Sequence, residues 1–387
     1  MGVYEAYHYS ESVEFCGEVC HDVMEPQYTA YQDSPHARVP CTACHVGEGA
    51  EWYAKSKLSG AYQVYAVTVN NYPHPIPTPI ENLRPARETC ERCHWPEKHY
   101  GGTMREFVHH RYDEENSPWH LEMQIKTSGS LAEGPHSSGI HWHINEDVTV
   151  EYIARDEKRQ DIPWVRYTDK RSGESVVYQN VDDPLEPEVI DTAEVRRMDC
   201  LDCHNRPSHV FHSPDYAVDQ LLTRGQVARD LPSIKAVAVE AMAEDYDSDE
   251  EAFTAIDQMI SAHYRENYPD LAAAKAGEIK QAIASVQSAF SRNIFPYMKA
   301  RWSAYPNNIG HFEDVGCMRC HLGNHESDAG QKITHDCSAC HTIVAQGPEG
   351  EMERATTKAG LEFKHPEDID EAWREWGCYE CHSGTQP

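Results

Sequence analysis

The feature that most constrains this chain is a cysteine pair followed directly by a histidine, which occurs seven times. In the pattern C-x-x-C-H the two thiols can bond covalently to a haem while the adjacent histidine binds its iron. All 14 cysteines of the 387 residues belong to these pairs. In chain order the motifs are Cys16/Cys20-His21, Cys41/Cys44-His45, Cys90/Cys93-His94, Cys200/Cys203-His204, Cys317/Cys320-His321, Cys337/Cys340-His341 and Cys378/Cys381-His382.

Zinc sites and disulfide frameworks also use paired cysteines, but neither requires a histidine directly after the second cysteine. Histidine makes up only 24 of the 387 residues, so its position after every pair is not a chance pattern. The first motif has three residues between Cys16 and Cys20 instead of two, and a structural disulfide is the alternative there. We therefore predict a heptahaem c-type cytochrome, with seven covalently bound haem c groups and an iron ligand from each motif histidine.

The composition predicts a core that is formed largely by haem. Hydrophobic residues are 40% of the chain, with 22 glycines and 23 prolines. This is a low apolar content for a chain of this length to build its core from side chains alone. We expect a multihaem cytochrome c, mostly coil and α-helix with a small β insertion, around stacked haems. A net charge of -30 argues against nucleic acid or an anionic membrane surface as a partner.

The motif spacing divides the chain into five expected parts. Residues 148–153, 164–167 and 175–178 alternate like strands, with a turn over 170–173, whereas residues 215–300 have helical spacing and predict three or four helices. Pro232 suits a first helical turn, and Tyr268-Pro269-Asp270 should separate two long helices. The parts are a three-haem domain at 1–118, a β-rich insertion at 119–195, a fourth haem segment at 196–214, a haem-free helical segment at 215–305 and a three-haem domain at 306–387.

The sequence contains neither a signal peptide nor a stretch of about 20 apolar residues that could span a membrane. Attachment of several c-type haems nevertheless implies export from the cytoplasm. We therefore expect the native protein to continue upstream of Met1, and to lie at the periplasmic face of the inner membrane or to be exported.

Low-spin haems need a second axial ligand, and 17 histidines lie outside the motifs. Those near an attachment motif are the first candidates: His36, His209, His325, His335 and His365. Further candidates are His74, His99, His109-His110, His311 and His141-Trp142-His143, and in each cluster we expect one histidine to be a ligand and its neighbour not.

Met24 lies three residues after His21 and is a candidate ligand in place of it. A thioether ligand raises the reduction potential relative to two histidines, so this haem would be the thermodynamically distinct one. Packing of Met24 against the porphyrin edge is the alternative interpretation.

Three segments resemble the NapC/NirT/NrfH group of membrane-anchored quinol dehydrogenases. They are Ser12 to Cys16, Cys20-His21-x-x-Met24, and Tyr31 to His36 leading into Cys41, and the likeness is strongest over residues 10–110. The remainder, including Cys317 to His321 followed by His325, is similar to longer multihaem members in inner-membrane electron export chains.

The resemblance implies that electrons come from menaquinol or another quinol at the first haem and pass to periplasmic or extracellular redox proteins. It also implies that Met24 lies at the quinol-side haem, that His36 is a distal ligand of another haem, and that Lys55 or Lys57 lies beside the quinol pocket, although a solvated lysine is the alternative. Two features depart from the short members, which have four haems and an N-terminal membrane helix.

Three functions follow as hypotheses. The first is a relay from a membrane quinol to periplasmic or outer acceptors, with quinol dehydrogenase activity in a membrane-anchored form. The second is a freestanding or filament-forming extracellular cytochrome. The third, a multihaem reductase, needs an open iron position, and no C-x-x-C-K motif of the nitrite reductase type is present.

Overall fold

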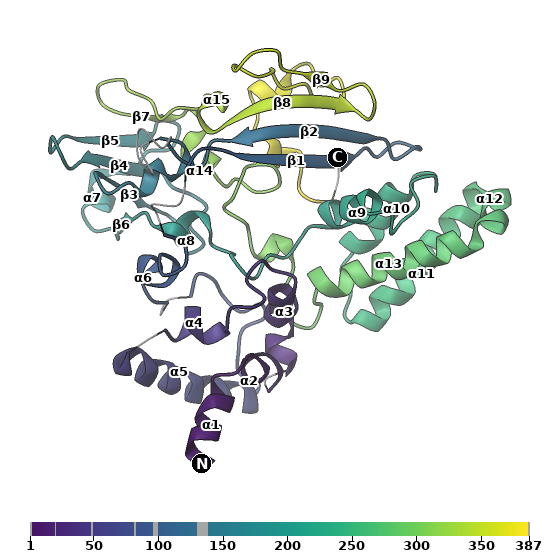
Figure 1. Cartoon of the computed structure of the whole chain (residues 1–387), viewed down its shortest axis with the longest axis horizontal. Coiled ribbons are helices and arrows are strands. Elements are labelled where there is room, and N and C mark those ends of the chain that lie inside the picture. The colour runs from purple at the N-terminus through teal and green to yellow at the C-terminus, as the bar shows by residue number, and fades with distance from the viewer. Residues whose placement is uncertain are drawn as a thin grey trace.

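The computed structural model describes residues 2–19, 21–47, 49–80, 83–95, 100–129 and 138–385, without the side chains of 2, 3, 6, 21, 22 and 50. Its N-terminal part is a set of helices at one end of the molecule (Figure 1). Ser12 begins α2 as an N-cap, since its hydroxyl accepts a hydrogen bond from the backbone N–H of Phe15. The helices are α1 (Gly2–Ser10), α2 (Val13–Glu18), α3 (His21–Gln32), α4 (Cys41–His45), α5 (Ala50–Thr68) and α6 (Ala86–Cys90).

One antiparallel sheet joins the middle of the chain to its C-terminal part. Strands β1 (Thr103–His110) and β2 (Pro118–Ile125) form a hairpin, and β2 also pairs with β8 (His341–Pro348), which is followed by β9 (Glu353–Arg354). The sheet order β1-β2-β8-β9 therefore crosses the expected boundary at residue 118 and joins the first and the last of the expected parts.

The second sheet contains the strands that the alternating sequence predicted. Strands β3 (Val148–Ile153), β4 (Trp164–Asp169) and β5 (Ser175–Asn180) are confirmed, and the predicted turn connects β4 to β5. Short strands β6 (Arg196–Arg197) and β7 (His325–Glu326) extend the sheet to the order β6-β3-β4-β5-β7. Val150, Tyr152 and Val165 turn inward and form a small apolar cluster with Ile162.

The haem-free helical segment projects from the side of the molecule (Figure 1). It contains α9 (Pro214–Thr223), α10 (Ile234–Ala243), α11 (Asp249–Asn267), α12 (Pro269–Ala274) and α13 (Ala276–Asn293), five helices where three or four were predicted. The predicted break at Pro269 is confirmed, but the alanine-rich stretch is split again at Lys275. Pro232 precedes α10 and is not in its first turn.

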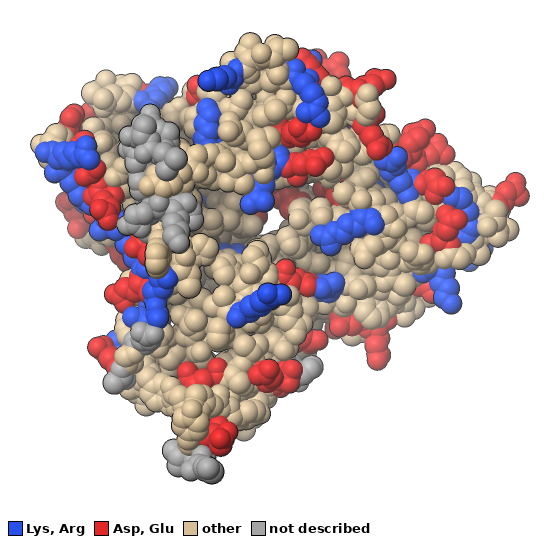
Figure 2. Space-filling view, in the orientation of Figure 1, with Lys and Arg blue, Asp and Glu red and all other residues tan. Residues whose placement is uncertain are grey.

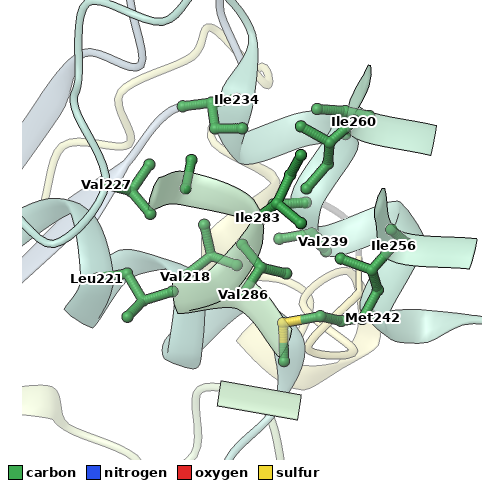
Figure 3. Close-up of a cluster of buried hydrophobic side chains, with 14 of the residues drawn as sticks. Val218, Leu221, Val227, Ile234, Val239, Met242, Ile256, Ile260, Ile283 and Val286 are labelled. Carbon is green, nitrogen blue, oxygen red and sulfur yellow. The ribbon is translucent and has the colours of Figure 1, made fainter. Parts of the chain in front are cut away.

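Buried apolar side chains are concentrated in this segment. Val218, Val239, Met242, Ile256 and Ile260 are fully buried and meet with side chains of α13 in one cluster (Figure 3). The clusters beside the cysteine motifs are much smaller. The fold as a whole mixes helices with two small sheets, which is more β structure than the sequence predicted.

The face shown in Figure 2 carries acidic and basic side chains in alternation, with acidic groups spread over it and not gathered in one patch. Across the described ranges, the structure contains no helix with the length and apolar character needed to cross a membrane.

Candidate haem-binding sites

The cysteine motifs form short helical turns. In α4, in α8 (Cys200–Cys203) and in α15 (Cys337–Cys340) the two cysteines are three residues apart, so they lie on one side of the turn. Asp199 and Asp336 begin α8 and α15 as N-caps, because their side chains accept a hydrogen bond from a backbone N–H of the first turn. Cys20 and the side chain of His21 lie outside the described part of the chain.

In the seventh motif the second cysteine lies just past the end of the helical turn. The 3₁₀ helix η5 (Cys378–Glu380) begins at the first cysteine, and Cys381 follows it as the C-cap. The backbone N–H of Cys381 donates to the carbonyl oxygen of Cys378 at 3.1 Å, so the turn still joins the two cysteines. Cys378 is partly buried, whereas Cys381 is exposed. The sequence did not predict this difference, and haem attachment at Cys381 stays a prediction.

The six motif histidines whose side chains the structure describes each face a second histidine from another segment. Their ring centroids are separated by 5.7 to 6.4 Å. The pairs are His45 with His209, His94 with His36, His204 with His141, His321 with His143, His341 with His311 and His382 with His365.

This separation fits an iron held between two imidazoles. A metal–nitrogen bond of about 2 Å on each side, with each ring centroid about 1 Å behind its nitrogen, places the centroids roughly 6 Å apart. Two imidazoles packed directly on each other would be closer, and two unrelated ones would show no constant spacing. The residues present therefore fit bis-histidine haem at the second to the seventh motif.

Hydrogen bonds at the other ring nitrogen support the same orientation. Nδ1 of His36 lies 3.0 Å from the carbonyl oxygen of Pro207, and Nδ1 of His209 lies 2.9 Å from that of Gln27. Since a carbonyl oxygen only accepts, Nδ1 carries the proton and Nε2 keeps its lone pair for a metal. The same contact to a backbone carbonyl oxygen is made by Nδ1 of His143 and His321. Nδ1 of His365 lies near both the carbonyl oxygen of Glu367, at 2.9 Å, and the backbone N–H of Glu367, at 3.2 Å, so these contacts do not fix its proton.

Three of the five first candidates for distal ligands, His36, His209 and His365, face a motif histidine. The other two have different neighbours. His325 is buried, with Nε2 at 2.7 Å from the carbonyl oxygen of Ile162 and Nδ1 at 3.1 Å from the side chain of Asn324. His335 lies against Gly323.

The short helix η2 (Ile140–Ile144) places two histidines against two different motifs. With three residues per turn, side chains two positions apart on a 3₁₀ helix point about 120° away from each other around the helix axis. His141 can therefore face His204 while His143 faces His321. We expected only one member of such a cluster to be a ligand, but both histidines of this cluster face a motif histidine. The H-x-H spacing is the sequence signal that could have indicated this arrangement.

The other histidines named from the sequence differ among themselves. His311 faces His341, although it lies before the fifth motif and not beside the sixth. His74 stacks on Tyr72 and contacts the carbonyl oxygen of Tyr297. His99 lies outside the described residues.

Successive motifs are neighbours in space. The thiols of Cys16 and Cys41, in the first and second motifs, share a hydrogen bond that lowers the pKa of Cys41 to about 7. Cys90 and Cys200, in the third and fourth motifs, are hydrogen-bonded in the same way. Thiols that bind haem as thioethers do not titrate, so these contacts matter here as marks of proximity.

The remaining motifs continue this order. Burial first, and then the charges of Cys41 and Cys93, raise the pKa of Cys44. Burial raises the pKa of Cys203 and of Cys320 to about 12, and each of the two is also within the electrostatic reach of the other motif. In the same way Cys340 is affected by Cys317, and Cys378 by Cys337 as well as by Cys381 of its own motif. From the second motif to the seventh, each motif therefore has its predecessor beside it.

A buried carboxylate fixes the fourth motif. Oδ1 of Asp202 accepts hydrogen bonds from the Tyr152 hydroxyl at 2.5 Å, from Arg196 Nε at 2.9 Å and from Arg159 at 3.2 Å. The backbone oxygen of Asp202 accepts a hydrogen bond from Arg319 of the fifth motif at 2.8 Å. The fourth motif is thereby joined to β3, to β6 and to the fifth motif.

The two lysines near the first motif have different surroundings. Lys57 Nζ lies 2.7 Å from Glu11, and the charges of both residues act on the pKa of Cys16. Lys55 is exposed and pairs with Glu51 at 2.9 Å on its own helix. The structure thus places Lys57 at the first motif and Lys55 in solvent, and Glu11 is a residue that sequence reasoning missed.

Met24 is half-buried, one helical turn after His21 in α3. Residues three positions apart lie on the same face of a helix. Met24 therefore lies on the same face of α3 as position 21, and its role as a ligand in place of His21 stays a prediction.

Comparison with known proteins gives two matches. Residues 1–76 match the model of the NapC/NirT cytochrome c family, N-terminal region. The whole chain is similar to the cytochrome c-type protein ImcH of Geobacter sulfurreducens, with 50% identity over 376 residues that cover 97% of this chain and 73% of that protein. No solved structure matches.

Proposed function

The chain belongs to the NapC/NirT cytochrome c family, and from that premise we propose that it carries electrons from a membrane quinol to periplasmic or outer acceptors through seven covalently bound haems. When bound, the haems supply one-electron exchange. The protein supplies their attachment, axial ligands, order and surroundings.

The observation that carries this proposal is the set of six histidine pairs at nearly constant separation. We assign His209, His36, His141, His143, His311 and His365 as the distal ligands of the second to the seventh haem, in that order. His325 and His335 keep structural roles in this assignment. Iron with two histidine ligands has no open position for a substrate, which argues against a reductase at these six sites.

The contacts between successive motifs support a single line of haems in chain order. The first motif lies at the end of the molecule that carries α1 and α5, and the seventh motif lies near the C-terminus (Figure 1). Because every haem between the two ends would have a neighbour on either side, electrons that enter at one end could leave at the other.

We place electron input at the first haem. The pair Lys57 and Glu11 lies beside Cys16, where it can hold the quinol hydroxyl and accept its proton. Met24 as axial ligand in place of His21 would raise the potential of this haem, which favours its reduction by quinol. We accordingly place the protein at the periplasmic face of the inner membrane.

The test is anaerobic mixing of the oxidised holoprotein, in detergent, with a menaquinol analogue while haem absorbance is followed. We expect reduction that slows at least tenfold in Lys57→Met and is unchanged in Lys55→Met, which removes the same charge from the same helix. If the analogue does not reduce the wild-type holoprotein, the quinol relay is wrong and a freestanding or filament-forming conduit takes its place. Equal rates in the two variants would place the quinol elsewhere.

A further inference from the structure

A buried group of charged and titratable side chains lies between β1, α9 and α10, and the haem assignment does not use it. The ammonium group of Lys235, whose side chain is 2% exposed, lies 2.8 Å from a carboxylate oxygen of both Asp215 and Asp219. The Nδ1 atoms of His109 and His110 are each 3.4 Å from an oxygen of Asp219. We call these five residues the β1 cluster.

The β1 cluster lacks one positive charge when both histidines are neutral, because one ammonium group faces two carboxylates. Among the residues that the structure describes, neither Oδ2 of Asp219 nor Nδ1 of His110 has a hydrogen-bond partner. The distance of 3.4 Å is longer than an ordinary N–H···O bond. A proton on either imidazole would balance the charge: on Nδ1 of His109 it would face Oδ2 of Asp219, and on Nδ1 of His110 it would face Oδ1.

The proton belongs on an imidazole and not on the carboxylate. Burial alone would raise the pKa of Asp219, but His109, His110 and Lys235 outweigh burial and hold that pKa well below its usual range. Three members of the β1 cluster, His109, Asp215 and Asp219, could also surround a metal ion. Lys235 already supplies the cation between the two carboxylates, so a second cation there is unfavourable.

The β1 cluster reaches the seventh motif through one aromatic ring. The ring of Phe312 lies 4.7 Å from that of His109 and is stacked on that of His382 at 4.5 Å. The pKa of His382 is lowered mainly by burial and then by His365, and the charges of Asp215, His109 and Lys235 act on it as well. A charge change at the seventh haem would therefore be felt in the β1 cluster.

Solvent reaches the other side of the β1 cluster. A cavity of about 470 Å³ between the β1–β2 hairpin and the end of α9 is lined by His110, His120, Gln220 and Arg229. His110 is thus in contact with both the cavity and Asp219, and Asp219 is next to His109. Imidazoles on both sides of a carboxylate can pass a proton inward by exchange of hydrogen-bonded protons.

We propose that His109 and His110, with Asp219 between them, form a proton-binding site that takes up one proton from solvent when the haem bound by His382 is reduced. The proposal rests on the proposed function, because it requires the seventh haem. The iron gains one electron, the imidazole gains one proton, and no other bond forms or breaks. Among the described residues, the other titratable or charged groups around the site are Lys235, Asp215, Tyr112, Glu313, Glu106, His120, Glu349, Arg229 and His382.

Potentiometric titration of the holoprotein at several pH values tests this site. The variant His365→Met would give the seventh haem a thioether ligand, which raises its potential and separates it from the other haems. We expect the electron affinity of that component to fall by up to tenfold for each pH unit, which is 59 mV for one electron. Adding His109→Phe, which keeps a ring against Phe312, should abolish this slope.

His120→Phe is the matched control, because His120 lines the same cavity but pairs with Glu106 and not with Asp219. It should leave the slope unchanged. His109→Gln serves if His109→Phe does not fold. The proton site is wrong, and the proposed function stands, if the separated component shows no pH dependence or if the slope remains in both His109 variants. If His365→Met moves no component, the ligation of the seventh haem is wrong and the proton site fails with it.

Discussion

Replacing Asp202 by asparagine tests how the fold keeps the fourth haem in line. The Asp202 side chain is only 1% exposed, and its carboxylate faces Arg159 and Arg196, whose side chains are 24% and 29% exposed. Asparagine keeps the shape but removes the charge, and its amide offers one oxygen where the carboxylate offers two. Either the bond from Tyr152 or the one from the backbone N–H of Asp199 is then lost.

The expected cost follows from these contacts. Loss of one hydrogen bond to a charged acceptor costs about 1.5–3 kcal/mol, and breaking a fully buried ion pair costs about 3–5 kcal/mol. Both arginines keep access to water, so the second figure has to be reduced. We expect Asp202→Asn to lower the free energy of unfolding by about 2–4 kcal/mol.

Urea unfolding of the holoprotein, followed by far-ultraviolet circular dichroism, measures this loss. The control is Asp199→Asn, which removes the same charge three residues away but keeps an N-cap residue, and should cost less than about 1 kcal/mol. Asp202→Asn should also raise the potential of the fourth haem, since a negative charge beside it is lost. Equal stability of the two variants would refute the role given to Asp202.

Three further predictions concern ligands and pH. His143→Ala should convert one haem to a high-spin spectrum, whereas His325→Ala should leave all haems low-spin, and the opposite result would restore His325 as a ligand. Met24→His should lower one potential out of seven, and an unchanged titration would remove Met24 as a ligand. Burial, opposed by the charge of Asp33 and helped by that of Arg224, lowers the pKa of His212 to about 4. The unfolded chain therefore binds more protons than the folded one between about pH 6.5 and pH 4. The free energy of unfolding should therefore fall as the pH is lowered through this range and should be flatter in His212→Gln; equal slopes in denaturant midpoints would contradict this.

The sequence alone predicts the attachment sites, because both thiols and the first axial ligand lie within one local pattern. The strands β3 to β5 and the helix break at Pro269 were predictable for the same reason, since alternation and proline act locally. Distal ligands obey no such local rule. His209 faces the second motif and His36 the third, and only the folded chain brings these segments together.

Nearness in sequence to a motif does not decide which histidine faces it in the fold. His325 follows the fifth motif closely, but β7 turns its ring toward the carbonyl oxygen of Ile162. His143, from the short helix η2, takes the position opposite His321 instead. The pairing of β2 with β8 was equally hidden, because each strand shows only its own alternation and not the identity of its partner.

The intact mass of the holoprotein under denaturing conditions tests the central claim most directly, because only covalently bound haem remains. The account predicts the mass of the polypeptide plus seven haems. Six haems, with two hydrogens lost, would mean that Cys16 and Cys20 form a disulfide and that the line starts at the second motif. A mass without haem would contradict the account entirely.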